Sequence, residues 1–327
     1  MNMMTAPSTE LRPDHDYTAI VEQHRREIHA HCYRMLASLH DADDAVQETL
    51  IRAWRGLDGF DGRSSVRTWL YAIATNVCLR AIERRRRRVL PIDTGPSSTV
   101  STATWELLDV WPDPYPTGGD DDPQNAAVQS ESLGLAFIAG VQLLPASQRA
   151  VLLLRDVHRF SARETASMLD MTSTAVNSSL QRARRTLAGS VRNGIDAASE
   201  LEPLERRRLA DRYVAAWESG DLQAVLDLFT DDAVFQMPPT ATWFSGREAI
   251  AEFLPNGPLG ERWKLLPTEA NGQLAFGCYA WDPEQTAFVA NSIDVIARRG
   301  SQVCGITAFL QPELLKNFGL PDQLRAT

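Results

Sequence analysis

Several features that would point to common protein classes are missing from this 327-residue chain. No apolar run approaches the roughly 18 residues that a membrane-spanning helix needs, so no membrane partner is expected. The first 16 residues have neither the basic cluster nor the apolar core of a secretory signal, which favours a cytoplasmic protein. The four cysteines form no CxxC pair, so we expect neither a disulfide framework nor a structural zinc site. These cysteines are Cys32, Cys78, Cys278 and Cys304.

Histidine is also scarce, and all six histidines lie at or before His158. His29, His31 and Cys32 are close in sequence, but within a helix their spacing places them around the axis rather than on one face. A shared metal ion is therefore not expected there, and no cofactor is predicted for the chain.

Charge is distributed very unevenly along the chain. Residues 17–88 contain 13 arginines against nine acids, and residues 136–192 contain eight arginines against three acids. Between them, residues 89–135 carry eight acids and no lysine or arginine, and residues 200–327 have 18 acids against 11 basic residues. Two basic blocks suggest a polyanionic partner, and the acidic segments can mask them.

Two helices are predicted in the first basic block. In residues 41–54, Ala42, Ala45, Val46, Thr49, Ala53 and Trp54 recur at helical spacing, while the acids fall on another face. Acids repel phosphate, so this helix suits docking to a protein; an ordinary amphipathic helix would show the same pattern. Residues 65–83 predict a second helix, with a buried stripe at Val66, Leu70, Ile73, Val77 and Ala81.

The second helix leads into an arginine string at residues 84–88. We expect the string to extend this helix, which carries Trp69, Tyr71 and Asn76. Aromatic rings stack on unpaired bases while arginine follows the backbone, so the combination suits melted DNA. A solvated helix end and a core position for Trp69 are the alternative interpretations.

Residues 91–123 contain clusters of proline, glycine, serine and aspartate that indicate a mobile linker, although the apolar patch at residues 105–111 can dock elsewhere. Helices are then predicted at residues 133–144 and 147–157. A helix-turn-helix follows, with helices at 161–169 and 172–187, and Ser161 with Glu164 forms a capping box. In such a motif one helix enters the major groove and its outer face reads base edges. A plain helical hairpin with a solvated face is the alternative.

The last third of the chain predicts a separate α+β domain. Helices are expected at residues 206–219 and 221–229, and strands at 233–237, 273–281, 286–297 and 302–311, the last two joined by a hairpin turn. Aromatic residues suggest an apolar pocket able to take a small ligand; they are Trp217, Phe235, Trp243, Phe244, Trp263 and Trp281. A catalytic base there would have to be a carboxylate such as Asp227, Asp232 or Asp294, because this domain has no histidine.

Taken together, these segments resemble a known family. Residues 33–36, 41–55 and 67–78 resemble region 2 of bacterial sigma-70 factors, closest to the extracytoplasmic-function group. Residues 144–157 and the helix-turn-helix resemble region 4 of that group, and residues 213–221 and 226–234 look like a SnoaL-like cone domain. The resemblance implies two all-α domains followed by an α+β cone, in a non-enzymatic subunit that directs RNA polymerase to promoters. The alternatives are a helix-turn-helix regulator that acts without the polymerase, and an isomerase-like enzyme with a DNA-binding arm.

The resemblance also implies a role for each motif. Core RNA polymerase would bind Asp43, Asp44, Gln47 and Glu48. The melted minus-ten element would be held by Arg63, Ser64, Arg67, Trp69, Asn76, Arg80 and Arg84. The minus-35 element of promoter DNA would be read by Thr174, Asn177, Ser178, Gln181, Arg182, Arg184 and Arg185. The acidic linker would follow the RNA-exit path of the polymerase, and the last domain would regulate activity in cis.

The implied organisation assigns every residue to a segment. It consists of a disordered N-terminus (1–16), region 2 (17–90), a flexible acidic linker (91–125), region 4 (126–192), a short linker (193–204) and a SnoaL-like domain (205–327). One departure from the family pattern lies in the turn of the helix-turn-helix, which often contains glycine. Here it is Asp170-Met171, and Asp170 would adopt the left-handed conformation at some cost.

Overall fold

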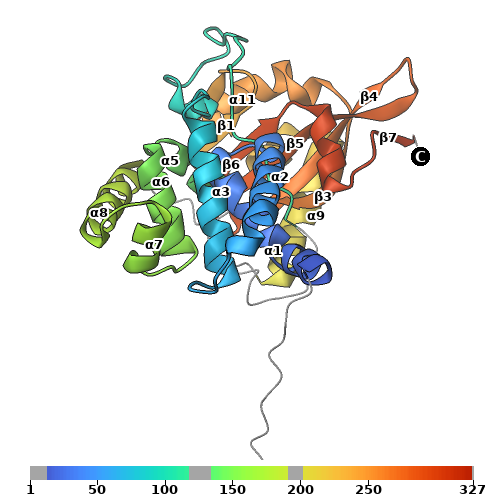
Figure 1. Ribbon diagram of the computed structural model, residues 1–327. Helices are drawn as coiled ribbons and strands as arrows, with labels where there is room; N and C mark the ends of the chain where they lie inside the picture. The colour runs from blue at the N-terminus through green and yellow to red at the C-terminus, as the bar shows by residue number, and fades with distance from the viewer. Residues whose placement is uncertain (1–12, 118–133, 191–201, 326–327) are drawn as a thin grey trace, which may run out of the picture.

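Two helical domains and a mixed-sheet domain follow one another along the chain (Figure 1). The computed structural model describes residues 13–117, 134–190 and 202–325. Within those ranges, no helix combines the length and the apolar character needed to cross a membrane. The predicted fold class, two all-α domains followed by an α+β domain, is confirmed.

The first helical domain contains α1 (Pro13–Leu36), α2 (Leu39–Gly56), the 3₁₀ turn η1 (Leu57–Gly59) and α3 (Val66–Ile82). Serine hydroxyls cap two of the helices: Ser38 accepts from the Asp41 amide and Ser65 from the Thr68 amide. Both predicted helices are therefore present. Residues 13–16, expected to be disordered, belong to α1, while residues 1–12 lie outside the described ranges.

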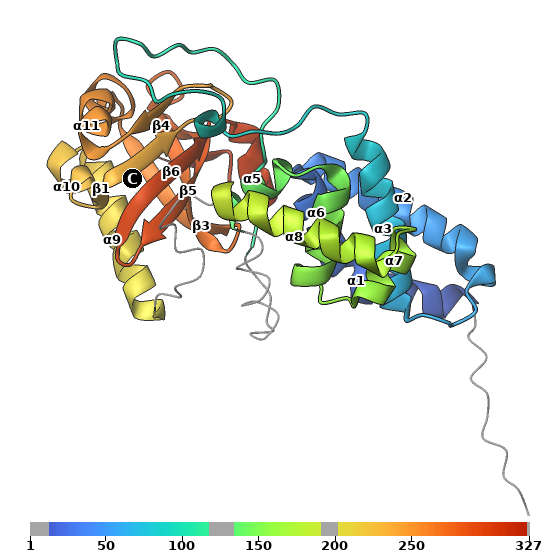
Figure 2. The same ribbon diagram turned by 90° about the vertical axis from the view of Figure 1, so that its left-hand side faces the viewer.

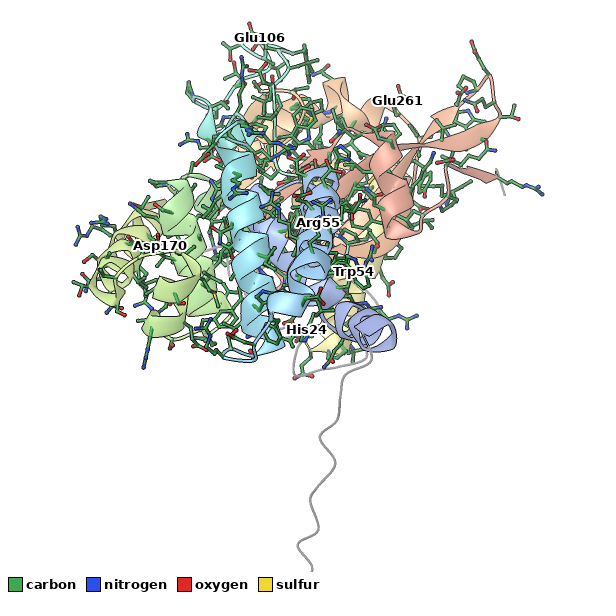
Figure 3. All side chains as sticks on the ribbon, in the orientation of Figure 1. His24, Trp54, Arg55, Glu106, Asp170 and Glu261 are labelled. Atoms are coloured by element: carbon green, nitrogen blue, oxygen red, sulfur yellow. The ribbon has the colours of Figure 1, made fainter. Side chains whose placement is uncertain are left out.

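The second helical domain contains α5 (Leu135–Gln142), α6 (Ala146–Leu152), a π-helical turn η3 (Leu153–Val157), α7 (Ala162–Met168) and α8 (Ser173–Ser190). The capping box is present: the Ser161 amide donates to Glu164 at 2.8 Å, and the Glu164 amide donates to Ser161 at 3.1 Å. Asp170, labelled in Figure 3, has a φ of 51°, so the left-handed turn predicted without glycine is also confirmed.

The tail domain begins with α9 (Pro203–Ser219) and α10 (Leu222–Leu226) and also contains α11 (Arg247–Asn256). Its sheet has the order β2-β1-β6-β5-β4-β3, with β7 paired to β5 and with β1 parallel to β6. The strands are β1 (Phe229–Gln236), β2 (Trp243–Ser245), β3 (Trp263–Ala270), β4 (Gln273–Asp282), β5 (Ala287–Arg299), β6 (Gln302–Phe309) and β7 (Gln323–Arg325). The helix expected at 221–229 ends at Leu226 because Phe229 starts β1.

The two faces of this sheet are covered in different ways. One face, with Phe235, Phe276 and Ile306, packs under α9, α10 and α11. The other face packs against the 3₁₀ segment η5 (Pro312–Phe318) and against residues from outside the tail domain, namely Leu90, Ile92, Trp111, Leu135 and Ala139. The hydrophobic core of the tail domain is therefore shared with the second helical domain and with the segment that joins the two helical domains.

Candidate nucleic-acid interface

The predicted minus-ten residues are spread along the whole of α3 and the loop before it. Arg63, Ser64, Arg80 and Arg84 are exposed near the two ends, and Arg63 pairs with Asp61 at 2.6 Å. At 1.5 Å per residue, the 17-residue helix separates these ends by roughly 25 Å. The structure therefore does not gather these residues into one pocket; it arranges them in a row, which suits an extended strand.

The middle of α3 is covered by the second helical domain. The Asn76 amide donates to the Met168 carbonyl at 3.2 Å. The Arg67 guanidinium lies 4.8 Å from the centre of the Phe160 ring and donates to Glu27 at 3.0 Å. Two of the seven predicted minus-ten residues thus contact the second helical domain, although Asn76 remains exposed and Arg67 is only half-buried.

A buried hydrogen-bonded chain joins the same two domains. His31 Nδ1 lies 3.0 Å from His158 Nε2, and His158 Nδ1 lies 3.1 Å from the Tyr71 hydroxyl. Thr75 donates its own proton to the Tyr71 carbonyl, so His31 Nε2, 2.9 Å from Thr75 Oγ1, must be the donor of that pair. With both imidazoles neutral, His31 Nδ1 accepts from His158 Nε2, and His158 Nδ1 accepts from the Tyr71 hydroxyl.

Burial has the same effect on the charge of both histidines. It lowers the pKa of His31 from 6.5 to about 3, and the Arg34 and Arg67 charges add to this effect. The pKa of His158 is lowered well below its ordinary value, mainly by burial and next by the charge that His31 would carry. The contact between the two helical domains is therefore strongest when both rings are uncharged.

Trp69 is half-buried, and its ring centre lies 4.9 Å from that of Phe60. The ring also lies close to Gly56, where an added Cβ would be 3.4 Å from Trp69 Cζ2. Trp69 thus packs against the core while part of its side chain stays exposed to solvent.

The arginine string does not extend α3 as predicted, because the helix ends at Ile82 and Glu83 begins a turn. The chain then folds back towards α2, where Asp41 is buried. Arg85 forms an ion pair with Asp41, and Arg88 donates to the same carboxylate at 3.0 Å. A buried carboxylate needs cationic partners, and this requirement holds the string in its turned-back course.

All seven predicted minus-35 residues lie on the exposed face of α8. Val176, Leu180 and Ala183 are buried on the opposite face, as the helical spacing predicts. Arg184 is the only arginine among the seven with an ion pair inside the described part of the chain; it makes a bidentate contact with Asp156 at 2.6 and 2.8 Å. The other members of this face are open to solvent.

The predicted polymerase-binding residues lie on the outer face of α2. Asp43, Asp44 and Gln47 are exposed and Glu48 is half-buried, paired with Arg52 at 2.6 Å. Trp54, labelled in Figure 3, shares the helical spacing of the apolar residues but is not covered: its side chain is 50% exposed, and that of Ile51 is 46% exposed. Residues 43, 47, 51 and 54 follow one another at helical spacing, so Asp43, Gln47, Ile51 and Trp54 form one exposed stripe, hereafter the α2 stripe.

Residues 89–117 run as an extended strap along the tail domain (Figure 2). The Leu108 amide donates to the Pro239 carbonyl at 2.7 Å, and the Ala241 amide donates to the Glu106 carbonyl at 2.8 Å. The Trp111 indole donates to Gln311 at 2.8 Å. A mobile linker was expected over 91–125; residues 91–117 instead satisfy their backbone groups on the tail domain, and 118–125 lie outside the described ranges.

Asn271, in a turn of the tail domain, forms a three-way junction. Its amide donates to the Tyr115 carbonyl at 2.7 Å, and its side-chain oxygen accepts from the Tyr115 amide at 2.9 Å. Its side-chain nitrogen donates to the Tyr33 hydroxyl at 2.9 Å, and that hydroxyl donates to the Asp113 carbonyl at 2.7 Å. The tail domain, the strap and the first helical domain therefore meet at the buried side chains of Tyr33 and Asn271. The sequence analysis did not identify either residue as a contact between domains.

The three carboxylates considered as catalytic bases differ in their surroundings. Asp227 pairs with Arg247 and Asp232 pairs with Arg299, each at 3.1 Å near the surface. Asp294 is buried and accepts from Ser292 at 2.9 Å. Burial raises the pKa of Asp294 to about 6.

The expected aromatic pocket is divided between the two faces of the sheet. Trp217 and Phe235 lie in the core under the helices, whereas Trp281 packs on the opposite face.

Comparison with known proteins adds three family matches in the same order. Sigma-70 region 2 matches residues 20–88, sigma-70 region 4 matches 135–187, and the SnoaL-like domain matches 210–304.

The chain is 43% identical over 327 residues to the ECF RNA polymerase sigma factor SigG of Mycobacterium tuberculosis (strain H37Rv), covering 97% of this chain and 87% of that protein. It is 28% identical over 177 residues to the ECF RNA polymerase sigma factor SigW of Bacillus subtilis (strain 168), covering 54% of this chain and 89% of that protein. The crystal structure of the M. tuberculosis extracytoplasmic function sigma factor SigJ has a similar fold, with a TM-score of 0.62 at 22% identity, covering 93% of this chain and all of that one.

Proposed function

This chain belongs to the extracytoplasmic-function (ECF) sigma factors of RNA polymerase, and from that premise we propose that it joins the core polymerase and directs it to promoters. The observation that carries this proposal is the separation of two surfaces with different chemistry. The α2 stripe places Asp43 and Gln47 in line with the exposed apolar side chains of Ile51 and Trp54, which suits a protein partner. The outer face of α8 carries amide, hydroxyl and guanidinium groups, which suit base edges and phosphates.

Each surface receives its own role. Asp43, Asp44, Gln47 and Glu48 dock on the polymerase, and Ile51 and Trp54 extend that contact. The row of residues along α3 holds the melted minus-ten strand, with Trp69 stacking on a base through its exposed edge. On α8, Asn177, Gln181 and Arg182 read bases, while Arg184 and Arg185 hold phosphates.

In the arrangement described, the chain cannot use both DNA-binding surfaces on one promoter. Only α6 and α7 lie between α3 and α8, so the two helices are roughly two helix spacings, about 20 Å, apart. The minus-ten and minus-35 elements are, by their names, about 25 base pairs apart, which is roughly 85 Å of duplex. The two helical domains must therefore separate to engage a promoter, and the closed arrangement is the form free of DNA.

The tail domain restrains the chain in this closed form. It holds the strap through backbone hydrogen bonds, and it completes its own core with Leu90 from the strap and Leu135 from the second helical domain. A strap bound in this way is not free to follow the RNA-exit path of the polymerase. We therefore assign the tail domain a regulatory role in cis, acting through the population of the open form.

Run-off transcription with purified core polymerase tests both parts of this proposal. Tyr33→Phe removes the hydroxyl at the three-way junction without changing the shape of the ring. A lost hydrogen bond of about 1 kcal/mol should increase the open population, and hence transcription at limiting protein, about fivefold. Tyr279→Phe is the matched control, because its hydroxyl donates to Pro321 inside the tail domain.

Each result has a distinct meaning. No dependence of transcription on the wild-type chain would reject the sigma-factor role and favour a regulator that acts without the polymerase. Equal activity of Tyr33→Phe, Tyr279→Phe and the wild type would reject only the restraint by the tail domain and would leave the sigma-factor role in place.

One observation favours a second role for the tail domain, as an acid–base enzyme. Asp294 is a buried carboxyl with a pKa of about 6, close to the value that a general base requires. Such a site would bind small apolar ketones, and thermal-shift measurements with a panel of them test the idea. Stabilisation by a ketone that disappears in Asp294→Asn would support the enzyme; no stabilisation would leave Asp294 a structural residue.

A further inference from the structure

A groove of about 440 Å³ opens between the arginine string and the turn that joins α5 to α6. Its polar lining consists mainly of cationic groups: Arg85, Arg86, Arg87, Arg88 and Arg149, with Asp41 as the acid. Aliphatic side chains, among them Ile82, Val110 and Leu144, form the rest of the wall. The first helical domain, the strap and the second helical domain all contribute to it, so the groove exists only in the closed arrangement.

Positive charge in this groove exceeds the negative charge that faces it. Asp41 is shared by Arg85 and Arg88, and Arg86 pairs outside the groove with Asp109. Arg87 forms no ion pair with any residue in the described ranges and is exposed. Burial and the charge of Arg88 lower the pKa of Arg85, which shows that the guanidinium groups disfavour one another's charge.

Arg149 is the second sign that an anion belongs here. Its side chain is only 4% exposed, and its guanidinium donates to carbonyl and amide oxygens of Met35, Gln142 and Leu144 rather than to a carboxylate. Its Nε is buried without a hydrogen-bond partner. A buried cation that lacks a counter-ion is costly, and an anion in the groove offsets that cost.

We propose that this groove binds a small phosphorylated molecule with an apolar or aromatic part, of the nucleoside polyphosphate class. Guanidinium groups bind phosphate oxygens in a bidentate manner, and the aliphatic wall provides a surface for a base. The volume falls within the range of small-molecule sites. A promoter strand is the poorer occupant, because the groove is lost when the two helical domains separate to reach a promoter.

Such a ligand holds the two helical domains together. It binds the closed form and not the open form, so it shifts the population towards the closed form and lowers promoter use. This regulatory consequence rests on the proposed function, but the binding itself does not, because it can be measured on the free protein.

Binding of methylanthraniloyl-GTP to the full-length chain, followed by fluorescence anisotropy, tests the proposal. Arg87→Ala removes a groove arginine that is exposed and makes no ion pair within the described ranges, so the variant keeps its fold. Loss of one charge-assisted contact to phosphate should weaken binding about tenfold or more. Arg84→Ala, in the same string but outside the groove, is the matched control and should change affinity less than twofold.

The same measurement can overturn the proposal. No binding at millimolar nucleotide, or equal weakening by Arg84→Ala and Arg87→Ala, would show only general attraction of anions to the string. Tighter binding of a single-stranded oligonucleotide, with the same sensitivity to Arg87→Ala, would assign the groove to nucleic acid instead. If GTP binds but does not lower run-off transcription, the groove is still a nucleotide site, but the closed form does not limit transcription.

Discussion

The two helices predicted to contact DNA, α3 and α8, are presented to solvent very differently. Along α8, the seven predicted residues face solvent, and Arg184 alone among its arginines is tied to an acid within the described residues. Along α3, Arg67 and Asn76 contact the second helical domain, and Tyr71 belongs to the buried histidine chain. The predicted duplex-reading face is therefore open along its whole length, whereas the second helical domain contacts two residues of the predicted surface for the melted strand and leaves the residues at its two ends exposed.

This difference suggests where control is exerted. Reading a minus-35 duplex requires only an exposed helix, which the closed form already has. If α3 holds the minus-ten strand as proposed, the second helical domain must move away from Arg67 and Asn76. The proposed regulation would then act on the step that follows DNA melting, and the experiments below should separate the two surfaces.

The largest effect is expected on α8. Arg182→Ala combined with Arg185→Ala should weaken binding to a minus-35 duplex, selected by this chain from a random pool, by about thirtyfold or more. The wild type should bind this duplex without polymerase, because α8 is exposed in the closed form. Fluorescence anisotropy measures the affinity of the wild type and of the double variant for this duplex. The control is Arg207→Ala with Arg208→Ala, two exposed arginines of α9; if it loses as much affinity, α8 does not read the element.

A smaller and opposite effect is expected at the contact between the helical domains. His158→Ala removes the contacts to His31 and Tyr71, each worth about 1 kcal/mol, so the closed form should lose roughly tenfold or more in population. Binding of a single-stranded minus-ten oligonucleotide should increase accordingly, while binding of the minus-35 duplex should not change. His40→Ala is the control, since His40 is exposed. An equal gain on both kinds of DNA would contradict the masking of α3.

The smallest effect is expected from pH. Both buried histidines have lowered pKa values in the closed form, and each returns to about 6.5 when exposed. The stabilisation of the closed form is therefore complete above pH 6.5 and is lost as pH falls from 6.5 towards 3. Between pH 7.5 and 6.0, the open population should rise about fourfold for each histidine. The groups that face the two rings are Glu27, Arg34, Arg67, Tyr71 and Thr75.

Minus-ten oligonucleotide binding at the two pH values measures this effect. The duplex bound by α8 is the internal reference, because no histidine lies on that helix. The pH dependence should be reduced in His158→Ala; an unchanged dependence would place the titrating group elsewhere.

Local patterns predicted the helices well. Serine caps, the capping box and the spacing of Val176, Leu180 and Ala183 are all set by neighbours in sequence. Strand β3 was missed because Pro267 interrupts its pattern, yet β3 lies at the edge of the sheet, where proline is tolerated. The short strands β2 and β7 and the helix α11 were also missed; β7 pairs with the much earlier β5, whereas β2 pairs with the neighbouring β1, and each of these two strands has only three residues.

What the sequence left open or missed in the candidate site has a common cause. The spacing places Trp54 with the apolar residues of its helix, but nothing in its local sequence shows whether the side chain is covered or exposed. The course of the arginine string depends on Asp41, more than 40 residues earlier, and Asn271 acts on residues far before it. Spacing reveals which residues share a helix face, but it does not reveal which distant segment packs there.

The exposure of Ile51 and Trp54 on α2 has a consequence for the order of assembly. This surface stays available whether or not α3 is covered, so encounter with the enzyme need not wait for any rearrangement. Part of the free energy of binding to the polymerase could then be used to separate the two helical domains. Under the proposed function, the free protein would stay in the closed form, and binding to the polymerase would open it.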